Sequence, residues 1–283
     1  MVKVVSDSTC DLSAELVERY GIEIIPLHII LGEKEYEDGV DIEPDEIYKW
    51  SDEHGTTPKT SAPAIDKAIE VFSRYKDSGD DVVVFTISSE MSTSFNVMKL
   101  AADEIDYTDH IHVVDSRSLS TGIGLLVIES AVMAKEGMAA GEIVSKVEEF
   151  IPRVRASFVV DTLVYLHRGG RCNGLTAMLG SILKLHPSIA VTNGVMGPEK
   201  KYRGKMHRVV SEYVQDLEKD LKNAKKDRVF ITHAGCDDVI VESVRSYLLD
   251  LGYFDEVLVT RAGGVISSHC GYGTLGVLFI AGN

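Results

Sequence analysis

VVVFTISSEMSTSF, residues 82–95, is the stretch that decides the fold. It opens with four apolar residues, three of them β-branched, a composition typical of a buried strand. Six hydroxyl side chains follow within nine positions, and an apolar pattern with helical spacing begins near Phe95. In open α/β sheets, ligands bind at the turn between such a strand and its helix. The stretch therefore predicts a parallel α/β sheet with a polar site at this turn.

The hydroxyl groups of this turn allow two interpretations. A helix N-terminus offers unpaired N–H groups and a partial positive charge, which suit an anion. Alternatively, one hydroxyl of residues 92–94 is an ordinary N-cap and the others are solvated. A cap requires a single hydroxyl, whereas the turn carries six. The stretch alone leaves both interpretations open.

Two other turns combine hydroxyls with an expected helix start. SDSTCD, residues 6–11, follows an expected strand over 2–5 and precedes a helix over 14–20 that Ser13 caps. GTTPKTSAP, residues 55–63, includes Thr60 and Ser61 and precedes another helix. Each turn can be a capping loop or part of a ligand site.

Composition limits the function classes. The chain has 283 residues, 45% of them hydrophobic and 26% charged, as in soluble globular proteins. A net charge of -15 argues against nucleic-acid binding. No apolar run is long enough for membrane insertion, and the first residues lack a signal-peptide core, so we expect a cytoplasmic protein. The cysteines have no metal-site spacing and are expected to be free thiols: Cys10, Cys172, Cys236 and Cys270.

The order of expected elements suggests two domains, 1–155 and 156–283. Strands and helices alternate in the first, and its helix over 119–136 is apolar on most faces and so central in the packing. The second contains a helix over 175–185, a hairpin with an Asn193-Gly194 turn, and a strand over 263–269 that ends on His269. Residues 33–41 are acidic and expected at the surface.

Two arginines flank a glycine pair at Arg168-Gly169-Gly170-Arg171. Arginine makes bidentate contacts to carboxylate or phosphate groups, and glycines expose backbone N–H groups. The alternative is a loop whose arginines pair with the acidic surface. A serine nucleophile requires a base and an orienting acid, and Ser92, His269 and Asp7 could supply them. Phosphate-binding P-loop and H-E-x-x-H patterns are absent from the sequence.

Six short motifs in a fixed order resemble the DegV family of bacterial fatty-acid-binding proteins. The resemblance runs nearly from end to end, and the order and spacing of the motifs together make it specific. The motifs are DSTCDL (7–12), TSAP (60–63), SSEMS (88–92), VVDS (113–116), YLHRGGR (165–171) and HCGYG (269–273).

The resemblance implies a two-domain α/β fold: an N-terminal Rossmann-like parallel sheet and a C-terminal mixed α/β domain, with a long-chain fatty acid between them. It implies that the carboxylate is bound by Thr60, Ser61 and Ser92, with His269 nearby, and we expect the adjacent Thr93 to belong to the same site. It further implies a carrier without cofactor or turnover of its own. A separate ATP-dependent fatty-acid kinase subunit would phosphorylate the bound carboxylate for lipid synthesis, on the side where Arg168 and Arg171 lie.

Two positions depart from the family pattern. Thr93 stands where glycine is usual, which narrows the backbone freedom near the head group, and Tyr272 stands where proline is usual. Burying fourteen methylenes would contribute up to roughly 11 kcal/mol, so the tail would supply most of the affinity and the head group the orientation.

Two other functions fit parts of the same sequence. One is a serine-type hydrolase or acyltransferase that uses Ser92 and His269. The other is a binding module for a small soluble carboxylate.

Overall fold

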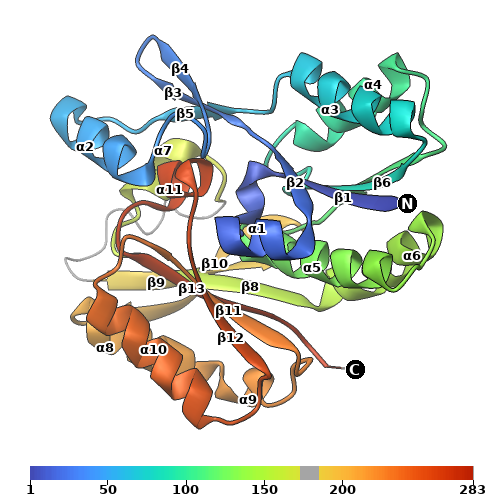
Figure 1. Cartoon of the computed structure of the whole chain (residues 1–283). Helices are drawn as coiled ribbons and strands as arrows, with labels where there is room; N and C mark the ends of the chain where they lie inside the picture. The colour runs from blue at the N-terminus through green and yellow to red at the C-terminus, as the bar shows by residue number, and fades with distance from the viewer. Residues whose placement is uncertain (173–184, 283) are drawn as a thin grey trace.

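The computed structural model describes residues 1–172 and 185–282, and in them the chain forms three β-sheets (Figure 1). One is parallel, with strand order β2-β1-β6-β7, and one is mixed, with order β10-β9-β8-β13-β11-β12. The third is small and antiparallel, with order β4-β3-β5. The predicted combination of a parallel and a mixed sheet is confirmed. A division at residue 155 remains a prediction.

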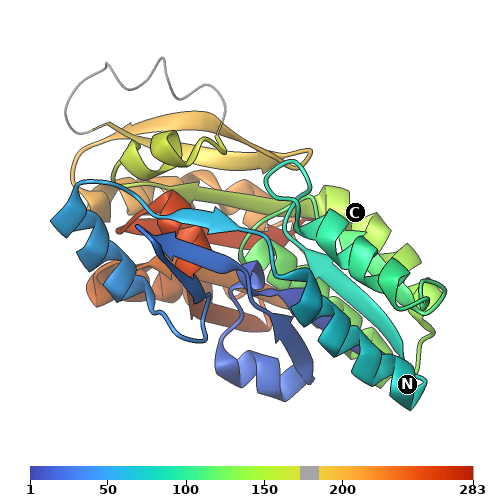
Figure 2. The ribbon, with the colours of Figure 1, turned by 90° about the horizontal axis from the view of Figure 1, so that it is seen from above.

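The parallel sheet has helices on both faces, which explains why residues 82–85 of its central strand β6 are all apolar. Val82 and Val84 pack towards α3 and α4, whereas Val83 and Phe85 pack in the cluster that contains α5 and α6 (Figure 2). The strands are β1 (Val2–Asp7), β2 (Ile22–Ile25), β6 (Asp81–Thr86) and β7 (Ile111–Asp115). The helices are α1 (Ala14–Tyr20), α3 (Ile65–Ser78), α4 (Ser94–Glu104), α5 (Thr121–Lys135) and α6 (Ala140–Phe150).

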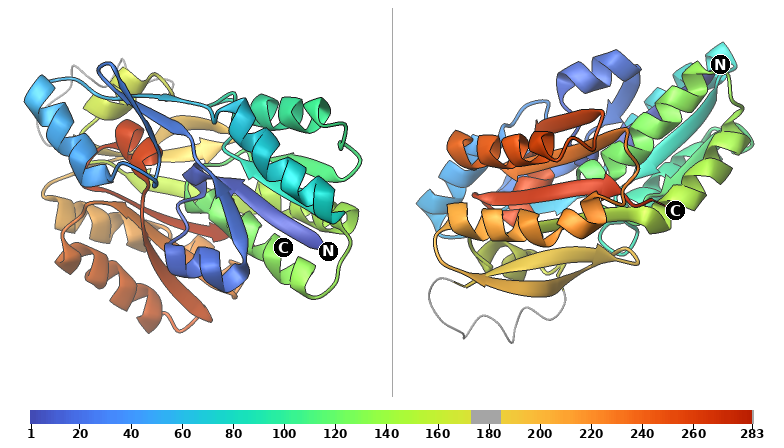
Figure 3. Two further views of the ribbon diagram at one scale, coloured as in Figure 1. Left: turned by 45° about the horizontal axis from the view of Figure 1, so that its top comes forward. Right: turned by 90° about the horizontal axis from the view of Figure 1, so that it is seen from below.

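The mixed sheet packs one face against α5 and the other against α8 and α10 (Figure 3). Strand β13 pairs antiparallel with both β8 and β11, so it lies inside the sheet. The strands are β8 (Val154–Val159), β9 (Leu185–Thr192), β10 (Val195–Arg203), β11 (Arg228–Ala234), β12 (Glu256–Arg261) and β13 (Thr274–Ile280). The helices are α8 (Met206–Asp216), α9 (Glu218–Leu221) and α10 (Asp238–Asp250).

Helix α5 lies between the two large sheets, as its all-round apolar sequence predicts. The hairpin of β9 and β10 turns at Asn193 and Gly194, both with positive φ, and is also confirmed. Ser13 caps α1 by accepting a hydrogen bond from the Leu16 N–H. Of the helix expected over 175–185, residues 175–184 lie outside the described residues, and Leu185 begins β9.

The small sheet packs with three short helices near the boundary between the two large sheets. Its strands are β3 (His28–Leu31), β4 (Lys34–Glu37) and β5 (Lys59–Ser61), and the helices are α2 (Pro44–His54), α7 (Val164–Gly169) and α11 (Gly264–Cys270). Short 3-10 helices cover Ser8–Cys10 and Ile151–Arg153. The strand predicted over 263–269 is wrong, because α11 occupies these residues. No helix among the described residues is long and apolar enough to cross a bilayer.

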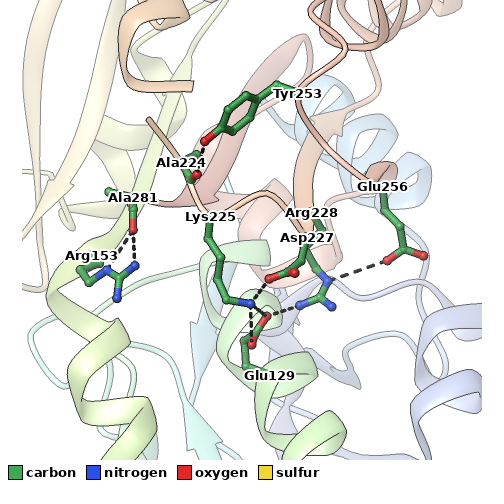
Figure 4. Close-up of polar contacts among 9 residues, drawn as sticks. All are labelled: Glu129, Arg153, Ala224, Lys225, Asp227, Arg228, Tyr253, Glu256 and Ala281. Carbon is green, nitrogen blue, oxygen red and sulfur yellow. Dashed lines mark hydrogen bonds and ion pairs between the residues drawn. The ribbon is translucent and has the colours of Figure 1, made fainter. Parts of the chain in front are cut away.

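A network of ion pairs joins α5 to the mixed sheet at the end opposite α11 (Figure 4). The Glu129 carboxylate of α5 accepts hydrogen bonds from Lys225, at 3.0 and 3.1 Å, and from Arg228 of β11. Lys225 also pairs with Asp227, and the Arg228 Nε lies 3.8 Å from the Glu256 carboxylate. Glu129 and Arg228 each expose only 10% of the side chain, so this network is largely buried.

Candidate functional site

A cavity of about 490 Å³ lies where β5, α11 and the turn after β6 meet. Its lining comes from both sides of the predicted domain boundary. The lining combines hydroxyl and charged groups with aliphatic side chains and methionines. The lining residues are Leu27, Thr60, Ser61, Ala62, Ile87, Ser89, Glu90, Met91, Ser92, Thr93, Asn96, Leu119, Arg171, Met196, Val265, Ile266, His269 and Cys270.

All five residues predicted for a carboxylate site line this one cavity. They come from three separate segments: Thr60 and Ser61 from β5, Ser92 and Thr93 from the turn before α4, and His269 from α11. Thr93 is exposed and stands at the edge of the cavity, so its side chain does not close the space. The structure thus brings these residues together, while their roles remain predictions.

His269 is the best-defined polar group of the cavity. Its Nε2 atom lies 2.7 Å from Thr60 Oγ1, and its buried Nδ1 atom makes no hydrogen bond. Burial lowers the pKa of His269 to about 4, and the positive charge of Arg171 adds to this effect. His269 is therefore neutral near pH 7. A Cβ atom at Gly169 would lie 2.4 Å from Nδ1, so α7 can approach the ring only because it has glycine there.

The hydroxyls of residues 86–94 divide into structural and cavity-facing groups. The Ser88 hydroxyl donates to the Gly194 carbonyl, at 2.7 Å, and ties the turn to the β9–β10 hairpin. The Ser89 hydroxyl donates to Asp115, at 2.5 Å. Ser92 Oγ accepts a hydrogen bond from the Ser94 N–H, at 3.2 Å, and also contacts the Ser94 hydroxyl. Ser92 thus supports the start of α4 and also lines the cavity. The other hydroxyls are not simply solvated, because Thr86, Ser88 and Ser94 are buried, and the ligand role of this turn stays a prediction.

The two arginines have different surroundings. Arg171 lines the cavity, and its Nη1 donates to the Gly169 carbonyl, at 2.8 Å, while Nε contacts the Met91 carbonyl at 3.5 Å. These contacts hold its positive charge at the edge of the cavity. Arg168 is exposed and does not line it. Arg168 and Arg171 were both predicted to face the kinase partner or the phosphoryl group. Of the two, only Arg171 lines this cavity.

Two buried carboxylates hold the N-terminus of α11 and explain why this segment is helical. Asp11 Oδ1 accepts a hydrogen bond from the Gly263 N–H, at 2.8 Å, and Asp38 Oδ1 from the Gly264 N–H, at 2.7 Å. Such bonds satisfy N–H groups that a helix start leaves unpaired. A Cβ atom at Gly264 would lie 2.5 Å from Ile29, so this close approach also requires glycine. Asp38 is buried, which corrects the prediction that residues 33–41 are all at the surface.

The turn over residues 7–11 shapes the cavity without lining it. Asp7 Oδ2 accepts a hydrogen bond from the Ile87 N–H, at 2.9 Å, and Ile87 lines the cavity. The Ser8 hydroxyl donates to Asp38, at 2.8 Å, and accepts from the N–H of Leu27, another lining residue. Asp11 accepts from Ser120 as well as Gly263. This turn therefore holds Ile87, Leu27 and the start of α11 in place around the cavity.

The three carboxylates Asp7, Asp11 and Asp38 have neutral donors as partners. Burial raises the pKa of Asp7 to about 6, and the hydrogen bonds from Thr9 and Ile87 only partly offset it. Burial likewise raises the pKa of Asp11 and of Asp38. Of the three, only Asp11 and Asp7 belong to a motif that the sequence singled out. Asp38 was missed because nothing in its acidic neighbourhood distinguishes it from the exposed carboxylates beside it.

Ser92, His269 and Asp7 do not form a hydrogen-bonded triad. The Nε2 atom of His269 bonds to Thr60, and its Nδ1 atom makes no hydrogen bond to an orienting acid. Asp7 bonds to Thr9 and Ile87 instead. The described residues also contain no group of three or more His, Cys, Asp or Glu side chains that could hold a metal ion.

The apolar part of the cavity leads towards the mixed sheet. A void of about 20 Å³ lies next to it and shares Leu119, Ile266 and Cys270 with its lining. The far side of the void consists of Phe158 and Leu278, among other residues of the sheet. Three side chains thus separate the cavity from this void.

Comparison with known proteins gives a consistent result. The sequence profile described as "Uncharacterised protein, DegV family" matches residues 1–282. A protein of Thermotoga maritima named fatty acid-binding protein is 32% identical over 285 residues, covering 97% of this chain and 96% of that protein. A DegV domain-containing protein of Caldanaerobacter subterraneus is 33% identical over 282 residues, covering 98% of each chain.

Solved structures agree with these matches. A fatty-acid-binding DegV family protein from Thermus thermophilus has a TM-score of 0.91 and 30% identity, with 99% of each chain covered. A stearic-acid-binding protein from Eubacterium ventriosum has a TM-score of 0.85 and 30% identity, covering 99% of this chain and 98% of that one. The sequence comparisons and the structure comparisons thus agree, and both cover nearly the whole chain.

Proposed function

The chain belongs to the DegV family, and from this premise and the geometry of the cavity we propose that it binds a long-chain fatty acid and does not turn it over. The observation that carries the proposal is that one cavity is lined both by the hydroxyls of Thr60, Ser61 and Ser92 and by aliphatic side chains and methionines. Relatives and structural neighbours that cover nearly the whole chain are described as fatty-acid-binding proteins.

The head group would lie between β5, the turn before α4 and α11. If the neutral His269 donates its Nε2 proton to Thr60, the Thr60 hydroxyl keeps its own proton for a carboxylate oxygen. Ser61 and Ser92 add further donors, and Arg171 contributes a positive charge at the edge. A carboxylate bound in this way exchanges hydration for oriented donors and a nearby cation.

The acyl tail would lie along the apolar part of the lining. Each buried methylene contributes about 0.8 kcal/mol, so the tail dominates the affinity. A longer chain could enter the neighbouring void if the side chains of Leu119 and Ile266 move apart. Thr93 would stand beside the head group and limit its position more than glycine would.

We further propose that the protein presents the bound carboxylate to a separate ATP-dependent kinase. The edge of the cavity is exposed at Ser61, Thr93, Asn96 and Arg171, so a partner can reach the head group there. The sequence has no P-loop of its own. In the transfer, a carboxylate oxygen would attack the γ-phosphorus of ATP, forming an acyl phosphate and releasing ADP, while Arg171 stabilises the developing charge.

Native mass spectrometry and fatty-acid titration test the binding function. We expect purified protein to carry a mass that matches a long-chain acid. Removing the Ser92 hydroxyl with Ser92→Ala should weaken binding by about 1.5–3 kcal/mol, roughly tenfold or more. Ser243→Ala, an exposed serine on α10, serves as the control and should bind as the wild type does. The absence of both bound acid and saturable binding would overturn the proposal.

The carrier role needs a second experiment with the kinase of the source bacterium. Protein, fatty acid and ATP should give no acyl phosphate until that kinase is added. Arg171→Ala and His269→Gln should then lower acyl-phosphate formation more than they lower fatty-acid binding. If Arg171→Ala lowered acyl-phosphate formation and fatty-acid binding equally, Arg171 would have only a structural role. Ester hydrolysis by the wild type that disappears in both His269→Gln and Ser92→Ala would favour the serine hydrolase instead.

A further inference from the structure

A second cavity, of about 390 Å³, opens on the molecule and shares no lining residue with the first. It is enclosed by α2, by the segment from the end of β8 into α7, and by the turn between α11 and β13. Its lining contains only aspartate, threonine and tyrosine: Asp45, Tyr48, Asp52, Asp161, Thr162, Tyr165 and Tyr272.

The three tyrosine rings form a corner. Tyr165 and Tyr272 each stand nearly perpendicular to Tyr48, at 84°, with ring centroids 6.4 and 5.5 Å from it. Tyr48 is buried, whereas 51% of Tyr272 is exposed, so the corner is closed at its base and open to solvent. The face of an aromatic ring attracts a cation through its negative potential, so a cavity lined by three tyrosine rings suits a positively charged group.

Two glycines hold the rings in this arrangement. A Cβ atom at Gly271 would lie 2.5 Å from the Tyr165 ring, and one at Gly235 would lie 2.6 Å from the Tyr272 ring. Both glycines also have positive φ, which other residues rarely adopt. The Tyr48 hydroxyl is buried and lies near Ser267 without a hydrogen bond of normal geometry. The two glycines and α11 therefore position the three tyrosine rings, and the aspartates of the cavity take no part in this.

The charge of the cavity is negative and incompletely paired. Arg261 pairs with Asp45, and the nearest basic group to Asp161 among the described residues is the Nδ1 atom of His186, at 3.7 Å. Asp52 forms no ion pair with any residue that the structure describes. Within the same described part of the chain, no lysine or arginine lies over the rings of Tyr48, Tyr165 or Tyr272. Among the described residues, the lining of the cavity thus combines three tyrosine rings with a carboxylate that has no ion pair, and no lining residue is a lysine or arginine.

We propose that this cavity binds an organic cation, an ammonium or guanidinium group. The rings contact the cation directly, and Asp52 and Asp161 supply the opposing charge at the opening. A desolvated organic cation suits this lining better than a small metal ion, because rings replace the oxygen ligands that hard metal ions require. The inference does not rest on the proposed fatty-acid function.

Titration of the full-length protein with two probes tests the site. Tetramethylammonium chloride represents a free quaternary amine, and Nα-acetyl-arginine amide represents a basic side chain of a protein partner. We expect saturable changes in the tyrosine signals of the NMR spectrum with at least one probe and none with sodium chloride at equal ionic strength. Preference for the first probe assigns a small amine or lipid head group, and preference for the second assigns a protein side chain. If neither probe gives a saturable change, the proposal is wrong.

Two variants locate the binding. Tyr272→Ala removes one wall and should weaken binding of the preferred probe about tenfold, while the fatty-acid content stays unchanged. Asp52→Asn is exposed on α2 and keeps the fold, and it should weaken binding about threefold through lost charge. Tyr20→Ala, which removes a tyrosine that Arg19 already covers, is the matched control and should bind normally. Wild-type affinity in both Tyr272→Ala and Asp52→Asn would refute the assignment to this cavity.

Discussion

Two groups of buried carboxylates connect distant parts of the chain, and they satisfy their charge in opposite ways. Asp7, Asp11 and Asp38, beside the cavity, accept hydrogen bonds from neutral N–H and O–H groups. Glu129, at the other end of α5, is paired with the cations of Lys225 and Arg228. The first arrangement fixes the direction of each bond, because backbone N–H groups cannot rotate freely. The second supplies attraction that depends less on direction.

The two groups of carboxylates differ because they hold different parts of the protein in place. The neutral donors belong to the cavity walls and to α11, whose position sets that of His269. A cation at the same place would also attract a bound carboxylate away from Thr60 and Ser92. The Glu129 network is remote from the cavity and shares no residue with its lining. Hydrogen bonds of fixed direction therefore lie beside the cavity, and strong charge pairing lies away from it.

The largest expected effect follows from breaking the Glu129 network. Glu129→Gln removes the carboxylate that Lys225 and Arg228 share. Arg228, only 10% exposed, then keeps only Glu256, at 3.8 Å, as an acidic partner among the described residues, so the free energy of unfolding should fall by about 3–5 kcal/mol in urea denaturation. Glu212→Gln, which breaks an exposed ion pair with Arg208, should change it by about 0.5 kcal/mol or less. Similar effects of both changes would show that burial does not strengthen the network.

The pH dependence of stability should distinguish the cavity carboxylates. The folded pKa of Asp7, about 6, exceeds its ordinary value, so its contribution is fully present below about pH 3.9 and is lost as the pH rises through about 6. Between pH 4 and 7, the stability of Asp7→Asn relative to the wild type should therefore improve by about 2–3 kcal/mol. Urea denaturation at a series of pH values measures this change.

Glu218 provides a control of opposite sign. Lys222 and Tyr247 lower the pKa of Glu218, so its contribution is present at neutral pH and lost as the pH falls. The stability of Glu218→Gln relative to the wild type should thus improve towards acid pH. If Asp7→Asn followed the same direction as Glu218→Gln, the raised pKa of Asp7 would be refuted.

A smaller effect should separate two buried serines of one region. Ser120 donates to Asp11 across the fold, at 2.5 Å, whereas Ser130 donates to the Leu126 carbonyl of its own helix. Ser120→Ala leaves a buried carboxyl with one donor fewer and should cost about 1–2 kcal/mol, together with weaker fatty-acid binding. Ser130→Ala should cost less than about 0.5 kcal/mol, and binding should not change. Equal losses in both variants would contradict a special role for the Asp11 bond.

The smallest effect is expected at the exposed edge of the charged network. Arg19 of α1 pairs with Glu256 at 2.8 Å, and 51% of its side chain is exposed. Arg19→Ala should lower the free energy of unfolding by about 0.5 kcal/mol, and high salt should abolish the difference. A larger loss of unfolding free energy that persists at high salt would show that Arg19 of α1 belongs to the buried network.

Much of the fold could be predicted because local signals agree with the packing. The apolar run of β6 and the apolar helix α5 both follow from residues buried on every side. Ser13 and Gly21 mark the ends of α1 in the sequence and in the structure. The hydroxyls that line the cavity were also recognised, since they cluster where strands end.

The errors arise where distant residues decide local structure. Val265 and Ile266, between glycines and serines, favour a strand by composition. Helix α11 forms there because Asp11 and Asp38, 252 and 226 positions away from their partners Gly263 and Gly264, bind its first N–H groups. A helix of seven residues is also too short to show a clear period. The buried environment of Asp38 and Glu129 likewise depends on contacts that no local pattern reveals.

The place of β13 in the mixed sheet has a consequence for how the protein is synthesised. β13 is the last strand along the chain, yet it separates β8, β9 and β10 from β11 and β12. Until it is present, β8 and β11 expose unpaired edges, and all seven β13 positions that will be buried have no partner. The mixed sheet must therefore wait for late translation, while the parallel sheet can assemble on the ribosome much earlier. The nascent chain would pass through a stage in which the parallel sheet and the small sheet are formed while the mixed sheet is still in two separate parts, and a chaperone would be most useful at that stage.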